Sequence, residues 1–145
     1  MTEDRHEPRP NETAYPSLLL ITADSQEVAT EREIEAAERF ERGEQVPHFL
    51  NFESPEDLRK ILTQRRLEAL RAIKANPPRS IRQLAERLDR NPAEVASDVN
   101  LLEEYGIVYV VENGQAKEPV VPYDEVRIEV SILGPNDGKR SPASM

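Results

Sequence analysis

The sequence has no cysteine, no tryptophan and only five glycines among its 145 residues. Without cysteine there can be no disulfide, cysteine-ligated zinc site, iron–sulfur cluster or thiol nucleophile. The longest run of aliphatic residues is Leu18–Ile21, far short of the roughly 20 residues that a helix needs to cross a bilayer. The start of the chain is polar and has no apolar signal core. We therefore expect a soluble, cytoplasmic protein that does not contact membranes.

Residue types that carry catalysis or bind metal are equally sparse. The histidines are His6 and His48, and neither has a second histidine or a clear carboxylate partner at a metal-ligand spacing. The glycines fall at helix ends, in a turn and near the end of the chain, so none forms a phosphate-binding loop. The sequence therefore predicts a protein that is not an enzyme and binds no metal or cofactor.

Lysine is also scarce, with four lysines against 15 arginines, and the formal net charge is −9. The charge is unevenly distributed: residues 1–58 carry −10, residues 59–90 carry +7 and residues 91–145 carry −6. We call residues 59–90 the basic segment. An acidic, lysine-poor composition is typical of proteins that stay soluble in high salt. A halophilic archaeal source is one hypothesis and an ordinary acidic protein is the other, and solubility at multimolar salt distinguishes them.

The first third of the chain predicts an arm and a small strand-helix-strand unit. Residues 1–16 are polar and contain three prolines, which is typical of a disordered arm. Residues 17–22 form an apolar run of strand length that predicts burial on both faces, a helix is expected over 23–44, and 48–52 predicts a second strand. The expected apolar stripe of the helix is Val28, Ile34, Ala37 and Phe40. Such a unit is too small to fold alone and must pack on later parts of the chain.

Helix starts recur through the middle of the chain, each marked by a residue that can cap the first turn. These capping residues are Ser54, Thr63, Ser80 and Asn91. The helices that we expect after the last three cover residues 63–76, 80–88 and 92–105. Pro77 stops one helix, and Gly106 ends another where a left-handed residue is favoured.

The remainder predicts strands. Residues 107–111 and 117–121 flank Asn113-Gly114, a pair that strongly favours a two-residue hairpin turn. Residues 126–132 alternate apolar and polar side chains, as a strand with one solvated face does. The tail 133–145 is expected to be unstructured.

Three short helices followed at once by a hairpin predict an α+β fold of the winged helix-turn-helix class, with a three-helix core and a β-hairpin wing. The predicted domains are an arm (1–16), a strand-helix-strand extension (17–53), the winged helix-turn-helix (54–132) and a tail (133–145). In this class the third helix enters the major groove, the second braces it across the backbone and the hairpin tip reaches an adjacent groove or phosphates. The alternative is a three-helix core whose hairpin touches no nucleic acid.

Arginine suits phosphate because its guanidinium group binds in a fork. The candidate contacts to DNA are Arg65, Arg66, Arg79, Ser80, Arg82, Arg87, Arg90, Ser97, Asn100 and Lys117. The competing interpretation of the basic segment is a solvated face that pairs with the acidic N-terminal helix, within one chain or between chains.

The expected outward face of helix 92–105 holds no lysine or arginine. Asn100 suits an adenine edge, and Ser97 suits a base or a phosphate. Glu94 and Asp98 would repel the DNA backbone unless they cap the helix or accept a hydrogen bond from cytosine. The sequence therefore favours docking on the backbone over reading of bases.

Several segments taken together carry a family resemblance. They are Leu62–Leu67, Pro78–Ala85, Leu88–Arg90, Val95, Asp98-Val99, Leu102, Tyr105–Val108 and Tyr123–Ile128. Over about residues 17–132 the chain resembles small MarR-like winged-helix regulators, which are common in haloarchaea and also found in bacteria. The resemblance implies DNA binding and transcription control. It also implies kinship with antitoxins that repress their own operon beside a small RNase-like toxin.

The sequence thus predicts a homodimeric repressor that binds double-stranded DNA, with an antitoxin-like autoregulator as one version. The N-terminal strand and helix and the last strand are expected to form the dimer contact, because an isolated edge strand invites pairing. The alternative is a protein–protein module whose basic segment docks an acidic partner, such as a cognate toxin or the transcription machinery.

Overall fold

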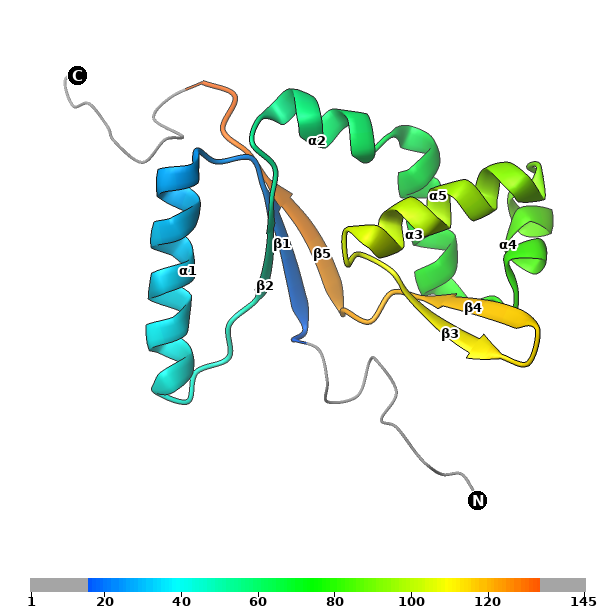
Figure 1. Cartoon of the computed structure of the whole chain (residues 1–145), viewed down its shortest axis with the longest axis horizontal. Helices are drawn as coiled ribbons and strands as arrows, with labels where there is room; N and C mark the ends of the chain where they lie inside the picture. Colours follow the sequence, from blue (N-terminus) through cyan, green and yellow to red (C-terminus); the bar gives the residue numbers. More distant parts are fainter. Residues whose placement is uncertain (1–15, 134–145) are drawn as a thin grey trace. The chain divides into compact units, whose positions relative to one another are not determined.

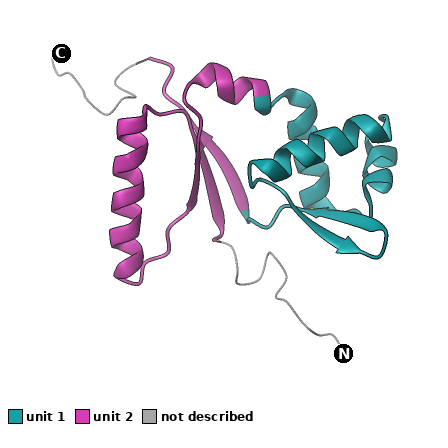
Figure 2. Cartoon of the chain, viewed as in Figure 1, with its two compact units in different colours: residues 1–15, 61–124 teal, residues 16–60, 125–145 magenta. Residues whose placement is uncertain are grey.

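The computed structural model describes residues 16–133. Within this range two compact units are distinguished: unit 1 is residues 61–124, and unit 2 is residues 16–60 and 125–133 (Figure 2). The predicted arm and tail lie outside the described residues except for Pro16 and Leu133. Among the described helices, none combines the length and the apolar composition that a membrane span requires.

The described chain is an α+β protein with five helices and two small sheets (Figure 1). The helices are α1 (Gln26–Glu41), α2 (Pro55–Ile61), α3 (Gln64–Ala75), α4 (Ile81–Leu88) and α5 (Pro92–Glu104). The strands are β1 (Leu18–Thr22), β2 (His48–Asn51), β3 (Tyr109–Asn113), β4 (Ala116–Val120) and β5 (Glu125–Glu129). Every predicted helix and strand is present, with ends shifted by a few residues.

Unit 2 is built on a parallel three-stranded sheet in the order β2-β1-β5. The predicted strand-helix-strand arrangement is confirmed, because β1 pairs in parallel with β2 and α1 connects them beside the sheet (Figure 1). The strand on the other side of β1 differs from the predicted domain division. The last strand, β5, pairs with β1 and so belongs with the N-terminal strands instead of with the hairpin. The reason is that the buried residues Leu19–Thr22 have backbone N–H and C=O groups directed to both edges of β1, and buried backbone groups need hydrogen-bond partners, which β2 supplies on one edge and β5 on the other.

A polar clamp joins the carboxyl ends of β1 and β2 to the start of α1. The Asn51 side-chain oxygen accepts hydrogen bonds from the Thr22 hydroxyl and from the Asp24 N–H, both at 2.7 Å. The Asn51 amide donates to the Asp24 carbonyl at 3.1 Å. Asp24 in turn accepts from the Arg32 guanidinium at 2.8 Å. The clamp satisfies polar groups that burial at the strand ends would otherwise leave unpaired.

The prediction of an apolar stripe on α1 is wrong. Ile34 and Phe40 are 56% and 68% exposed, and Ala29 is the buried residue of this helix. The half-buried positions are Val28, Arg32 and Ala36. The helix therefore packs through small residues and the Arg32 contact, because the α1 sequence offers alanine and arginine, not large apolar residues, on that face. It also begins after the Ser25 cap and ends at Glu41, so it is shorter than the predicted 23–44.

Unit 1 confirms the predicted helix caps. The Thr63 and Ser80 hydroxyl oxygens accept from the N–H groups three residues later, and Asn91 accepts from two N–H groups of the first turn of α5. The turn between α4 and α5 is closed by Asp89 in the left-handed region, at φ 56°. Gly106 takes φ +77° after α5, where a side chain would be strained. Local capping chemistry therefore sets the ends of these helices.

The core of unit 1 is aliphatic, and the helices lead directly into the hairpin. Its fully buried residues include Ile73, Leu84, Val95, Val99, Leu102 and Ile107. Strands β3 and β4 pair antiparallel, as predicted, although β3 starts two residues later than expected. The turn also lies one residue later than predicted: Asn113 pairs with Ala116 inside the hairpin, so the two turn residues are Gly114, at φ +65°, and Gln115. Tyr123 holds the end of unit 1 against the helices. Its hydroxyl donates to the Gly106 carbonyl after α5, and its own carbonyl accepts from Lys74 of α3.

Candidate nucleic-acid interface

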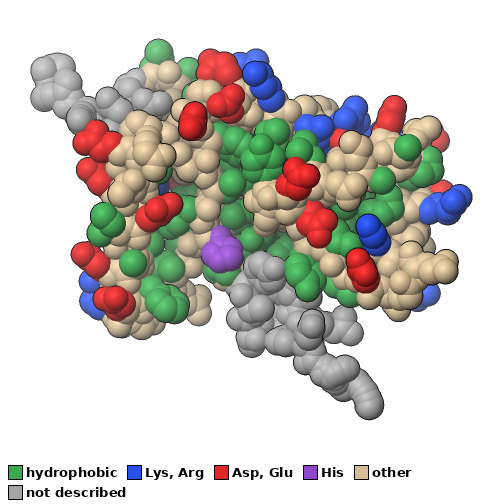
Figure 3. Space-filling model, viewed as in Figure 1, with side chains coloured by type: hydrophobic (Ala, Val, Ile, Leu, Met, Phe, Trp, Pro, Cys, Tyr) green, Lys and Arg blue, Asp and Glu red, His purple; other side chains and the backbone are tan. Residues whose placement is uncertain are grey.

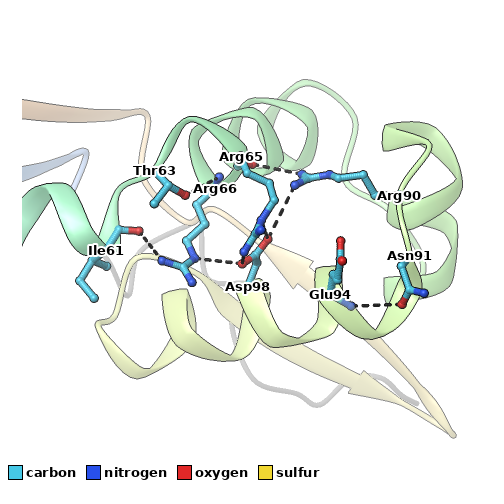
Figure 4. Close-up of polar contacts among 8 residues, drawn as sticks. All are labelled: Ile61, Thr63, Arg65, Arg66, Arg90, Asn91, Glu94 and Asp98. Atoms are coloured by element: carbon cyan, nitrogen blue, oxygen red, sulfur yellow. Dashed lines mark hydrogen bonds and ion pairs between the residues drawn. The ribbon is translucent and has the colours of Figure 1, made fainter.

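A fully buried carboxylate lies at the centre of the predicted interface. Asp98 of α5 is 0% exposed and accepts hydrogen bonds from two arginines of α3 (Figure 4). Arg65 binds both of its oxygens, through Nε at 2.8 Å and Nη2 at 2.9 Å. Arg66 adds a bond from Nε at 2.9 Å. Arg90, between α4 and α5, brings a third positive charge within 3.8 Å.

These contacts correct the prediction that Arg65, Arg66 and Arg90 face phosphates. The side chains of Arg66 and Arg90 are only 15% and 16% exposed, while that of Arg65 is 47% exposed. Arg66 also donates to the Ile61 carbonyl, and Arg90 donates to the Arg65 carbonyl. All three guanidinium groups therefore join helices to one another. We call them, together with Asp98, the Asp98 cluster.

Asp98 was expected near the outer face of its helix, and this expectation is wrong as well. A signal for the inner position was present in the spacing, because Asp98 stands with Val95, Val99 and Leu102 at i, i+3, i+4 and i+7. An acid on an apolar stripe needs a buried cation to offset the cost of its burial. The spacing alone does not identify the arginines that supply this buried positive charge.

Within the cluster the pKa values of Asp98 and Arg65 are shifted. Burial raises the pKa of the Asp98 carboxyl, but the hydrogen bonds and positive charges of Arg65 and Arg66 outweigh burial, so this pKa lies below its ordinary value. The hydrogen bond to Asp98 raises the pKa of Arg65. Both shifts favour the charged pair in the folded state.

A stability change with pH is expected from this shift. The folded pKa of Asp98 is lowered, and the unfolded value lies at about 3.9. The stabilisation is therefore complete above about pH 4 and is lost as the pH falls toward the folded pKa. Urea unfolding at a series of pH values should show a steeper loss below pH 4 in the wild type than in Asp98→Asn. Equal slopes in the two proteins would contradict the role of this carboxyl.

The arginines at and before α4 are arranged differently. Arg79, Arg82 and Arg87 are exposed, and none of them forms an ion pair with an acid in the described part of the chain. Arg87 donates to the Asn76 carbonyl and to Gln83, whereas the side chains of Arg79 and Arg82 make no hydrogen bond to residues 16–133. Ser80, also a predicted contact, uses its oxygen to cap α4. The guanidinium groups of these three arginines, at or just before α4, are therefore not engaged by an acidic side chain of residues 16–133.

The other candidate contacts lie among acids. Ser97 and Asn100 are exposed on α5, as predicted. Lys117 is exposed on β4, but the strand register places it opposite Glu112. Acidic and basic side chains are interspersed over unit 1 on the face drawn in Figure 3. Positive charge is thus concentrated at α4 and offset at the hairpin.

No grouping of three or more His, Asp or Glu residues within 16–133 is placed to hold a metal ion. His48 is the exposed first residue of β2, and His6 lies outside the described residues.

Comparison with known proteins finds one sequence-family model that is similar to part of this chain. Residues 61–128, which include all of unit 1 and most of β5, match the family model HVO_A0114. No curated protein and no solved structure matches the chain. The family's name states neither a fold nor a function, so the resemblance to MarR-like regulators stays a prediction.

Proposed function

We propose that this protein is a DNA-binding transcriptional regulator of the winged-helix class and acts as a homodimer. The order α3, α4, α5 and then the β3–β4 hairpin supports this class, since it is the order of a helix-turn-helix core followed by a wing. On this proposal α5 enters the major groove, α4 lies across the sugar–phosphate backbone and the hairpin tip reaches an adjacent groove.

One observation carries the proposal: Arg79, Arg82 and Arg87 surround α4 without an acidic partner among the described residues. In helix-turn-helix proteins the helix that precedes the recognition helix crosses the backbone. Guanidinium groups there bind phosphate oxygens. The phosphate contacts are therefore assigned to these three residues, and the Asp98 cluster is assigned to holding α3, α4 and α5 together.

On this proposal few side chains of α5 are suited to contact base edges. Ser97 and Asn100 are the exposed polar neutral residues of α5 that suit base edges. Exposed Glu94, Glu103 and Glu104 on the same helix oppose close approach to phosphates. The proposed binding is therefore dominated by the backbone, and discrimination between DNA sequences is expected to be modest.

Salt dependence tests the proposal directly. Fluorescence anisotropy would follow the full chain on a labelled duplex from upstream of its own gene and on an unrelated duplex of equal length. Three phosphate contacts per protomer in a dimer predict a slope of log K against log salt of about −5. An upstream duplex bound more tightly than the unrelated one would favour an autoregulator. Absence of binding to both duplexes at low salt would contradict DNA binding.

A second candidate is a protein–protein module whose arginines dock an acidic partner. The observation that favours it is the negative charge of α5 and the β3–β4 hairpin, the surfaces expected to face DNA. They carry Glu94, Glu103, Glu112 and Glu118, but among the candidate contacts only one lysine, Lys117. In its antitoxin version the partner is a small toxin, and a toxin-like gene beside this one would favour that version. A salt-sensitive complex with that purified toxin, formed by a chain that binds no duplex, would support this candidate.

A further inference from the structure

Strand β5 is an edge strand of the sheet in unit 2. It pairs with β1, and no strand of the described chain lies on its other side. The Glu125 N–H donates to the Ser17 carbonyl, next to β1. Because neighbouring residues of a strand point their backbone groups in opposite directions, Val126 and Ile128 direct theirs toward the open edge. A row of unpaired N–H and C=O groups of this kind is a template for another strand.

The charges of β5 are self-complementary in an antiparallel pair. Glu125, Arg127 and Glu129 alternate with Val126 and Ile128, and the charged residues are exposed. If two copies pair with Ile128 at the two-fold axis, each Arg127 lies opposite the partner's Glu129. If the axis passes through Arg127, like charges lie opposite each other instead, which is destabilising. The intrachain bonds from Arg127 to Glu125, at 3.1 and 3.2 Å, are exposed and leave Arg127 able to bridge both acids.

The apolar residues favour the same register. Ile128 is 44% exposed although it lies on the face of the sheet that carries Leu19 and Ile21. With Ile128 at the axis, the two Ile128 side chains meet, and each Val126 lies opposite the partner's Val130. An axis at Val126 also pairs Glu125 with Arg127, but it places Ile128 opposite Asp124. Cross-strand apolar and opposite-charge pairs each stabilise a sheet.

We propose that β5 pairs antiparallel with β5 of a second copy about Ile128, so that two three-stranded sheets join into one of six strands. This inference rests on the proposed homodimer and specifies its contact. It requires no DNA, so its failure and the failure of DNA binding are observed separately.

Charge exchange tests the register. Arg127→Glu places a glutamate side chain opposite the partner's Glu129, and Glu129→Arg places two arginines opposite each other. Each variant alone should raise the dimer dissociation constant roughly tenfold or more, because both symmetric pairs become repulsive. Mixing the two variants restores opposite charges at both pairs, so a heterodimer of near wild-type stability should form. Sedimentation equilibrium without DNA measures the dissociation constants, and circular dichroism of each variant checks that it is folded.

Glu125→Arg is the matched control, since it makes the same substitution on the same face but lies opposite Ser131 in the proposed register. In this register Glu125→Arg alone should dimerise like the wild type, and its heterodimer with Arg127→Glu should be weaker than the wild-type dimer, because one of the two charge pairs stays repulsive. Restoration by Glu125→Arg and not by Glu129→Arg would overturn the register about Ile128. A wild-type monomer at all concentrations tested, or Arg127→Glu and Glu129→Arg variants that each dimerise as tightly as the wild type, would overturn the strand contact itself.

Discussion

Replacing Asp98 with asparagine is expected to lower the free energy of unfolding of unit 1 by about 3 kcal/mol. The carboxylate is fully buried and offsets the charges of three arginines. Asparagine keeps the size of the side chain, so the loss comes from the charge and not from a cavity. Arg66 and Arg90, which are mostly buried, would be left without a counterion. Arg65 is half exposed and can turn toward water, which places the effect at the lower end of the range for a broken buried ion pair.

Urea unfolding followed by tyrosine fluorescence measures this loss, because Tyr105, Tyr109 and Tyr123 all lie in unit 1. Glu103→Gln is the control: it removes a carboxylate from the exposed face of the same helix and should change the free energy by less than about 0.5 kcal/mol. An Asp98→Asn protein as stable as this control would show that the cluster does not hold the helices together.

Replacing Arg79 and Arg82 with alanine is expected to weaken duplex binding roughly sixtyfold per protomer at 0.1 M salt, about eightfold for each of the two phosphates that are no longer neutralised. Neither side chain is hydrogen bonded to a described residue, so the double variant should fold normally. The loss of affinity should be equal for the upstream and the unrelated duplex, because phosphate contacts carry no sequence information. The slope of log K against log salt should become shallower by about 0.9 for each arginine removed.

Two single variants separate this role from a structural one. Arg71→Ala removes an exposed arginine of the same unit that is not assigned to phosphate, and it should leave the salt slope unchanged. Arg65→Ala should lower the stability of unit 1 and leave the slope of the folded protein unchanged. If the double replacement of Arg79 and Arg82 leaves the slope as it is in the wild type, α4 is not the element that crosses the backbone.

Signals within a few residues of one another predicted most of the secondary structure. Ser80 and Asn91 cap helices in the structure because their side-chain oxygens reach N–H groups only two or three residues away. Gly114 marks the hairpin because the turn needs a glycine at positive φ, although the turn residues are Gly114 and Gln115 instead of the predicted Asn113 and Gly114. The candidate contacts Arg79, Arg82 and Arg87 also follow from local sequence, since a charged side chain on a short helix is exposed unless something distant claims it.

The sequence by itself therefore determined the helices, the hairpin turn and the arginine-rich middle of the chain, whose causes are local. Only the tertiary structure decided that β5 completes the sheet beside β1, more than 100 residues away in the chain. It likewise decided that Asp98 engages Arg65, Arg66 and Arg90. An arginine side chain is long enough to bind either a phosphate or an internal carboxylate. The choice between them depends on which buried charge lies within reach after the helices have packed.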